Sequence, residues 1–142
     1  MPKSTTFCND WLKLVFNATA TANLADNAGT SPLANLYVSL HTGDPGAGGN
    51  QSTSETGYTG YARVAVARTS GGWTVSSNSV SPVADITFGA CSAGTATITH
   101  WAVGTASSGT GKILYSGTVS PSISISAGVT PKLTTSSTIS ES

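Results

Sequence analysis

The sequence carries little charge of either sign. Of its 142 residues, six are Lys or Arg and six are Asp or Glu, which gives a formal net charge of zero and a charged fraction of 8%. An average soluble domain has roughly 25% charged residues. Proteins that bind nucleic acids need a surplus of positive charge, because their affinity depends on neutralising phosphates. The composition therefore argues against nucleic acid as a direct partner.

Cysteines and long apolar runs are also scarce. The two cysteines, Cys8 and Cys91, lie in none of the Cys/His spacings that hold zinc or carry redox chemistry, so we expect two buried free thiols. No apolar run approaches the roughly 18 residues of a membrane span. Asp10 and Lys13 interrupt the region in which a signal peptide would need an apolar core. We therefore expect no membrane partner and a product that stays in the compartment where it is made.

Side chains that carry catalysis are few. His41 precedes Asp44 by three residues, which would allow a hydrolase triad, but the sequence contains no Gly-x-Ser-x-Gly elbow. Residues 109–112 resemble a phosphate loop, although Ala106 and Ile113 stand where that motif needs Gly and Ser or Thr. A hairpin turn is the better interpretation of this run. We expect no enzyme, no catalytic residue, no cofactor and no metal.

Small hydroxyl side chains and glycines dominate instead, with 22 serines, 22 threonines and 16 glycines. Short stretches of alternating polarity between turn residues are typical of an all-β sandwich or barrel. We predict a jelly-roll-like β-sandwich of about eight strands. The expected strands are residues 36–41, 61–68, 73–77, 83–88, 95–103, 112–119, 122–126 and 132–140. The expected core includes Leu40, Val64, Val66, Ile86, Phe88, Ile98 and Leu114.

One helix is predicted, over residues 5–17. Thr6 can cap its start and Asn17 can end it. Four apolar side chains recur at helical spacing, and they would form its packing face. These residues are Phe7, Trp11, Leu14 and Val15. This face can dock on the protein's own sandwich or on a partner, and both readings stay open. We predict an N-terminal helix and linker arm over residues 1–35, followed by the β-sandwich over residues 36–142.

The first predicted strand should be half-buried, because apolar and polar residues alternate along it. After it, residues 42–60 contain many turn-forming groups and are expected to form a long exposed loop. The two expected strand faces are Leu36, Val38 and Leu40 on one side, and Tyr37, Ser39 and His41 on the other.

Five segments, taken in order, resemble a family of small tailed-phage structural proteins. The family comprises head decoration or cementing proteins, including one of a short-tailed Bordetella phage, and its members are often labelled tail-fibre-like. The matching stretch covers about 80 residues and none of its motifs is catalytic. The segments are LYVSLHTGDPG at 36–46, GYAR at 60–63, ITF at 86–88, TITHW at 97–101 and ILYSG at 113–117.

The resemblance implies a jelly-roll sandwich that binds the outer surface of an icosahedral phage head and stabilises the expanded, DNA-filled state. Assembly would take place in the bacterial host cytoplasm. The implied partners are the major capsid protein and a second copy of the chain in a homodimer. The alternative is a tail-fibre or receptor-binding module that holds glycans on aromatic faces. The aromatic candidates for that alternative are Tyr58, Tyr61, Trp73, Trp101 and Tyr115.

The candidate site residues are therefore partner contacts. They come from the helix face and from the end of the first strand with the loop that follows it. The nine candidates are Phe7, Trp11, Leu14, Val15, His41, Asp44, Pro45, Glu55 and Tyr58.

Overall fold

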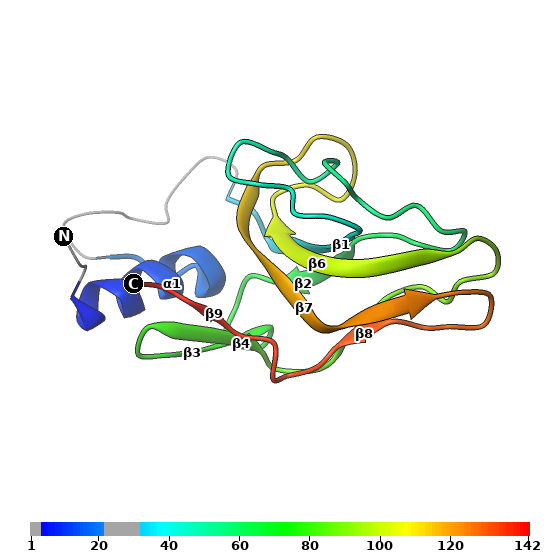
Figure 1. The fold of residues 1–142 in the computed structure, drawn as a ribbon. Coiled ribbons are helices and arrows are strands. Elements are labelled where there is room, and N and C mark those ends of the chain that lie inside the picture. The colour runs from blue at the N-terminus through cyan, green and yellow to red at the C-terminus, as the bar shows by residue number, and fades with distance from the viewer. Residues whose placement is uncertain (1–3, 22–31) are drawn as a thin grey trace. The chain divides into compact units, whose positions relative to one another are not determined.

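The computed structural model describes residues 4–21 and 32–142 of the chain (Figure 1). Within these ranges it contains nine strands and one short helix, so the predicted all-β class with an N-terminal helix is confirmed. The strands form antiparallel sheets with the orders β2-β1-β6-β7, β3-β4-β9 and β5-β8. The elements are α1 (Thr5–Asn17), β1 (Asn35–His41), β2 (Val64–Ala67), β3 (Trp73–Ser76), β4 (Ser79–Pro82), β5 (Ile86–Thr87), β6 (Ala96–Gly104), β7 (Ile113–Ile125), β8 (Lys132–Leu133) and β9 (Ile139–Ser140).

The chain forms two compact units. The first comprises residues 1–35, 66–85 and 133–142, and the second comprises residues 36–65 and 86–132. The division expected from sequence, residues 1–35 and 36–142, stays a prediction; the first unit also contains two later segments of the chain. Most of the predicted linker at 18–35 lies outside the described residues.

The helix has the predicted bounds. Its N-cap is Ser4 instead of Thr6, because the Ser4 side chain accepts a hydrogen bond from the Phe7 N–H at 3.2 Å. At the other end Ala18 adopts the left-handed conformation, with φ of 53°, and its N–H closes the last turn on the Lys13 carbonyl. The helix therefore stops directly after Asn17, as expected.

The buried face of the helix differs from the predicted one. Cys8, Leu12 and Phe16 are buried, and they follow one another at i, i+4 and i+8. The Phe16 ring meets the fully buried Trp73 of β3 edge to face, with ring centroids 4.8 Å apart. The helix thus packs on its own chain, against β3 and β4.

The predicted apolar stripe is displaced around the helix from that buried face. Phe7 and Trp11 are 39% and 42% exposed, whereas Leu14 and Val15 are half-buried. The structure instead buries the stripe whose last member, Phe16, can reach Trp73.

Arg68 ties the end of the helix to the rest of the first unit. Its Nε donates to the Val15 carbonyl and its Nη2 to the Leu14 carbonyl, both at 2.6 Å. A cation is favourable here because the last carbonyls of a helix lack partners within the helix. Partial burial lowers the pKa of Arg68, so the contact comes at a desolvation cost.

Strand β4 was not expected, because its residues lie between the strands predicted at 73–77 and 83–88. The structure pairs β3 with β4 in a hairpin, and Pro82 stands opposite Trp73 at the end of the ladder. Ser77 has φ of 55° in the two-residue turn between the strands, as tight hairpin turns require. The single strand expected at 132–140 is in fact two short strands, β8 and β9.

In the second unit, β6 pairs with β1 on one side and with β7 on the other. The loop between β6 and β7 contains residues 109–112, which confirms the predicted hairpin connection. β7 is one strand where two were expected, and its pairing with β6 shifts register between Thr118 and Ile123, around Pro121. Proline is tolerated in an edge strand, where its missing N–H costs no ladder hydrogen bond.

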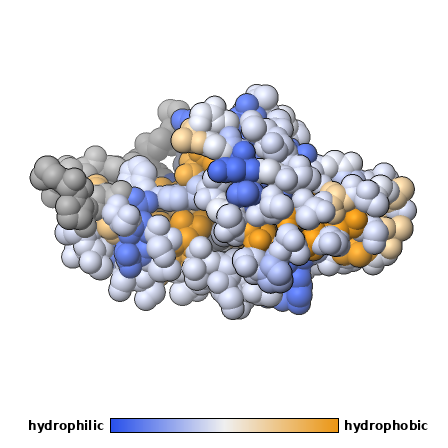
Figure 2. All heavy atoms as spheres, viewed as in Figure 1, coloured by the Kyte–Doolittle hydropathy of each residue, from blue (hydrophilic) through white to orange (hydrophobic). Residues whose placement is uncertain are grey.

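The surface reflects the composition. Figure 2 shows a face of the molecule on which most spheres are pale, with a few strongly hydrophilic or hydrophobic groups between them.

Most predicted core residues are buried, including Leu40, Ile86, Phe88 and Ile98, whereas Val64, Val66 and Leu114 are half-buried.

Candidate functional site

The segment expected to be an exposed loop folds back onto β1. The Thr42 N–H donates to the Ser54 carbonyl at 2.8 Å, and the Thr56 N–H donates to the Leu40 carbonyl at 3.0 Å. This return of the chain covers the second face of β1. Ser39 and His41 are fully buried as a result, so the prediction of a half-buried strand was wrong there.

His41 connects the loop to β1 from inside. Its Nδ1 lies 2.8 Å from the Thr53 carbonyl and its Nε2 lies 2.9 Å from Ser39 Oγ. A carbonyl can only accept, so Nδ1 carries the proton of the neutral ring and Nε2 accepts from the Ser39 hydroxyl. Asp44 instead accepts from the Gly46 N–H at 2.9 Å, so the triad considered from sequence is not assembled here.

The protonation of His41 makes stability depend on pH. Burial lowers the pKa of His41 below its usual 6.5, so the unfolded chain takes up a proton at a higher pH than the folded chain. We expect the free energy of unfolding to fall as the pH drops below about 6.5, by at most about 1.4 kcal/mol per pH unit from this group.

Urea titrations between pH 8 and 5 measure this change in the free energy of unfolding. His41→Asn should flatten the profile and the matched control His100→Gln should not. An unchanged profile in His41→Asn would contradict the assignment.

Gln51 is the second buried polar side chain of the loop. It is fully buried, its Nε2 donates to the Tyr37 carbonyl at 3.2 Å, and its Oε1 accepts from the Ala106 N–H at 3.0 Å. There is room for the Gln51 side chain because two neighbouring residues, Gly104 and Gly111, have no Cβ. A Cβ at Gly104 or Gly111 would collide with the Gln51 side chain.

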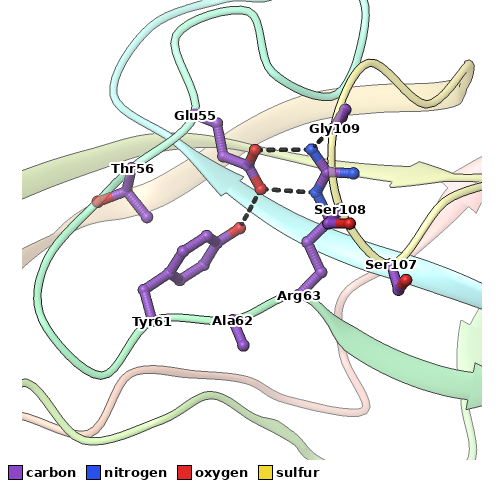
Figure 3. A pocket seen from close by; sticks show the side chains of 8 residues that line it. All are labelled: Glu55, Thr56, Tyr61, Ala62, Arg63, Ser107, Ser108 and Gly109. Atoms are coloured by element: carbon purple, nitrogen blue, oxygen red, sulfur yellow. Dashed lines mark hydrogen bonds and ion pairs between the residues drawn. The ribbon is translucent and has the colours of Figure 1, made fainter.

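A charged cluster lies at the end of the same loop, in a surface hollow of about 300 Å³ (Figure 3). The Arg63 guanidinium donates two hydrogen bonds of 2.7 Å to the Glu55 carboxylate, from Nε to Oε1 and from Nη2 to Oε2. The Tyr61 hydroxyl donates to the same Oε1 at 2.8 Å. All these donors point at one carboxylate.

Arg63 also reaches the β6–β7 loop. Its Nη1 donates to the Ala106 carbonyl at 3.0 Å and its Nη2 to the Gly109 carbonyl at 2.7 Å. The Arg63 side chain is only 2% exposed, against 16% for Glu55. The cluster therefore joins two loops that are about 50 residues apart in sequence, and we call Glu55, Tyr61 and Arg63 the loop clamp.

The loop clamp holds its protons firmly. The hydrogen bond to Glu55 raises the pKa of Arg63, and burial raises the pKa of Tyr61. Both groups therefore keep their protons at any physiological pH. What the arrangement can do is hold the two loops in a fixed relation and present their outer residues.

The segment Gly-Tyr-Ala-Arg at 60–63 now has a physical explanation. Tyr61 and Arg63 alternate to the same side and meet Glu55, while Ala62 between them is exposed (Figure 3). Gly60 has φ of 103°, and a Cβ there would collide with the Ala90 carbonyl, so only glycine fits.

The aromatic residues considered for a glycan platform are largely internal. Trp73, Trp101 and Tyr58 are buried, and the Tyr58 hydroxyl donates to a backbone carbonyl at 2.8 Å. Tyr61 packs between Tyr58 and Phe88, with ring centroids 5.5 and 6.2 Å away. These four rings serve packing, whereas Tyr115, the fifth candidate, is half-buried.

The nine predicted partner contacts differ in burial, and whether any touches a partner stays a prediction. The exposed ones are Phe7, Trp11 and Asp44; the half-buried ones are Leu14, Val15 and Glu55; the buried ones are His41, Pro45 and Tyr58. The predicted partner contacts included Glu55 but not Gln51, Tyr61 or Arg63, and Tyr61 was considered only as a glycan-binding aromatic. The segment at 60–63, which contains Tyr61 and Arg63, pointed to this region, and no sequence signal pointed to Gln51.

In the part of the chain that the structure describes, no group of three or more His, Cys, Asp or Glu side chains could hold a metal ion. Over the same residues, no helix is both long and apolar enough to cross a membrane.

The comparison with known protein families gives one result. The family described as Podophage GP4 fiber I protein gp80 matches this chain over residues 2–140. No curated protein matches it. Because the family match includes both units of the fold, the chain belongs to the podophage GP4 fiber I protein gp80 family and is a phage structural protein.

Proposed function

We propose that the protein is a non-enzymatic subunit of a fibre on the phage particle, acting through binding. The observation that carries this proposal is the family match over residues 2–140, since the family's description is that of a fibre protein. It favours the fibre alternative over the head-decoration role that the sequence segments implied.

The geometry supports a binding role. The loop clamp and Gln51 fix residues 42–63 and the β6–β7 loop through buried hydrogen bonds. A contact surface that is already ordered loses less conformational entropy on binding than a mobile one. Loops held in this way suit repeated attachment to neighbouring virion proteins.

Head decoration is the second candidate. It is favoured by the segments at 36–46 and 60–63, which resemble decoration proteins and which the structure brings together around His41 and Glu55. In that role the partners would be the major capsid protein and a second copy, on the outer surface of the head. Many weak contacts with the expanded shell would stabilise it by mass action.

Localisation on the particle separates the two candidates. Gold-labelled antibodies against the protein should mark fibres in electron micrographs, and mass spectrometry should find the protein in fibre-containing fractions of disrupted particles. Unexpanded precursor shells provide the negative control. Labelling spread evenly over full, expanded heads, with none on fibres, would overturn the fibre proposal and support decoration.

A further inference from the structure

The surface hollow beside the loop clamp has the size of a small-ligand site. Its volume of about 300 Å³ is at the lower end of the roughly 300–1,000 Å³ that small-molecule pockets have. It lies within the second unit, and its lining comes from residues 55–56, 61–63 and 107–109 (Figure 3). The hollow therefore has room for one ring-sized ligand and not for an extended chain.

The carboxylate of Glu55 keeps one hydrogen-bonding position open. A carboxylate can accept about four hydrogen bonds. Oε1 accepts from Tyr61 and from Arg63 Nε, whereas among the described residues Oε2 accepts from Arg63 Nη2 alone. The Glu55 side chain is also 16% exposed. A ligand in the hollow can thus donate a further hydrogen bond to Oε2.

Ligands that carry a charge do not suit this hollow. Nε of Arg63 donates once, Nη1 once and Nη2 twice, so four of the five N–H groups of a guanidinium are already used within the protein. Because Arg63 is only 2% exposed, an anion would find almost no donor. A cation would meet a carboxylate whose charge Arg63 already balances, so little net attraction remains.

The remaining polar side chains that face solvent in the hollow are hydroxyls. Ser107 and Ser108 line it and are exposed, and a serine hydroxyl can both donate and accept. The neighbouring hydroxyls of a sugar ring also do both, so they match one acceptor on a carboxylate and two serines. Arg63 holds these groups in place by bonding to Glu55 and to the Gly109 carbonyl, which lowers the entropy cost of binding.

We propose that this hollow binds a single uncharged sugar ring through the open position of Glu55 Oε2 and the hydroxyls of Ser107 and Ser108. Its use on the particle rests on the proposed fibre function, and the source of the ring there is the exposed end of a polysaccharide on the host surface. Many copies of a weak site on one particle raise the overall affinity.

An NMR titration of the full chain tests the site. The probes are the methyl glycosides of glucose, galactose, mannose and N-acetylglucosamine, at concentrations about tenfold above a millimolar dissociation constant. At least one of them should shift the backbone amides of residues 55–63 and 107–109. Glucuronate and glucosamine, which carry a negative or a positive charge on the same kind of ring, should bind more weakly.

A double variant tests the two serines. Ser107→Ala/Ser108→Ala removes both hydroxyls and leaves the loop clamp intact, and it should raise the dissociation constant of the sugar about tenfold, as expected for the loss of two ordinary hydrogen bonds. Ser122→Ala/Ser124→Ala is the matched control, because these serines are exposed at the end of β7 that is far from the β6–β7 loop. The control should bind the sugar as the wild type does.

Four results would overturn the sugar site. These are the absence of shifts at these amides with all four glycosides, charged sugars that bind as tightly as uncharged ones, a Ser107→Ala/Ser108→Ala variant that binds like the wild type, and tighter binding of the peptide probe N-acetylglycinamide than of any sugar. Gold label on fibres without sugar binding would overturn the site alone. Sugar binding with label only on heads would overturn the fibre function and leave the site standing.

Discussion

Replacing Arg63 by alanine is expected to lower the free energy of unfolding by about 3–5 kcal/mol. The guanidinium is 2% exposed and donates to both oxygens of Glu55 and to the carbonyls of Ala106 and Gly109. Its removal leaves a partly buried carboxylate without its cation and frees two loops from each other. Urea denaturation at pH 7 measures the loss.

A double variant separates the charge from the packing. Glu55→Gln/Arg63→Met removes both charges and keeps similar volumes, so it should be more stable than Arg63→Ala. Arg63→Lys keeps the charge but cannot donate two parallel hydrogen bonds to the carboxylate. Its free energy of unfolding should therefore lie between those of the wild type and Arg63→Ala. A loss below about 1 kcal/mol in Arg63→Ala, as expected for an exposed ion pair, would show that the loop clamp contributes little to stability.

Replacing Trp73 by alanine should cost about 3–5 kcal/mol, because it leaves a large cavity under the helix. Trp73 is fully buried and its ring packs against Phe16. The loss should appear in thermal or urea unfolding, and hydrogen exchange of the α1 amides should rise with it.

Trp11→Ala is the matched control, since it removes the same side chain from the same unit at a position that is 42% exposed. Its cost should be clearly smaller than that of Trp73→Ala, because less apolar area leaves water on folding. Equal losses in the two variants would mean that α1 does not pack through Phe16 and Trp73 in solution.

Local sequence patterns were sufficient for the elements that local chemistry determines. The helix over residues 5–17 and the strands at β1, β3 and β6 agree closely with prediction, because capping residues, period-two alternation and turn residues lie within a few positions of each element. The stripe that packs on the chain itself, Cys8, Leu12 and Phe16, was not predicted, because Trp73, the partner of Phe16, is 57 residues away from it. Nothing between Phe7 and Val15 shows which of two neighbouring stripes will meet that ring.

Proline explains the errors in the strands. Pro82 and Pro121 both lie between expected strands, yet one ends a hairpin ladder and the other lies within an edge strand. Whether a proline ends a strand depends on which side of it carries the ladder hydrogen bonds, and that is decided by the neighbouring strand.

The candidate site was predicted only in part for a similar reason. Glu55 stood out as one of few charged residues in a polar segment, but its meaning depends on Arg63 and on the carbonyl of Gly109. The segment looked too polar to be core. Gln51 of this segment is nevertheless buried, because its side chain finds backbone partners on β1 and on the β6–β7 loop. The segment is also held from β1, because the His41 side chain bonds to the Thr53 carbonyl.

The fit of Gln51 against two glycines limits the order in which this region can evolve. A side chain at Gly104 or Gly111 collides with Gln51, while a smaller residue at position 51 only opens space and releases the Tyr37 carbonyl and the Ala106 N–H. A lineage that acquires alanine at position 104 must therefore first lose the large side chain at position 51, whereas alanine at position 111 also collides with Ala106. Across related sequences, positions 51 and 104 should change together.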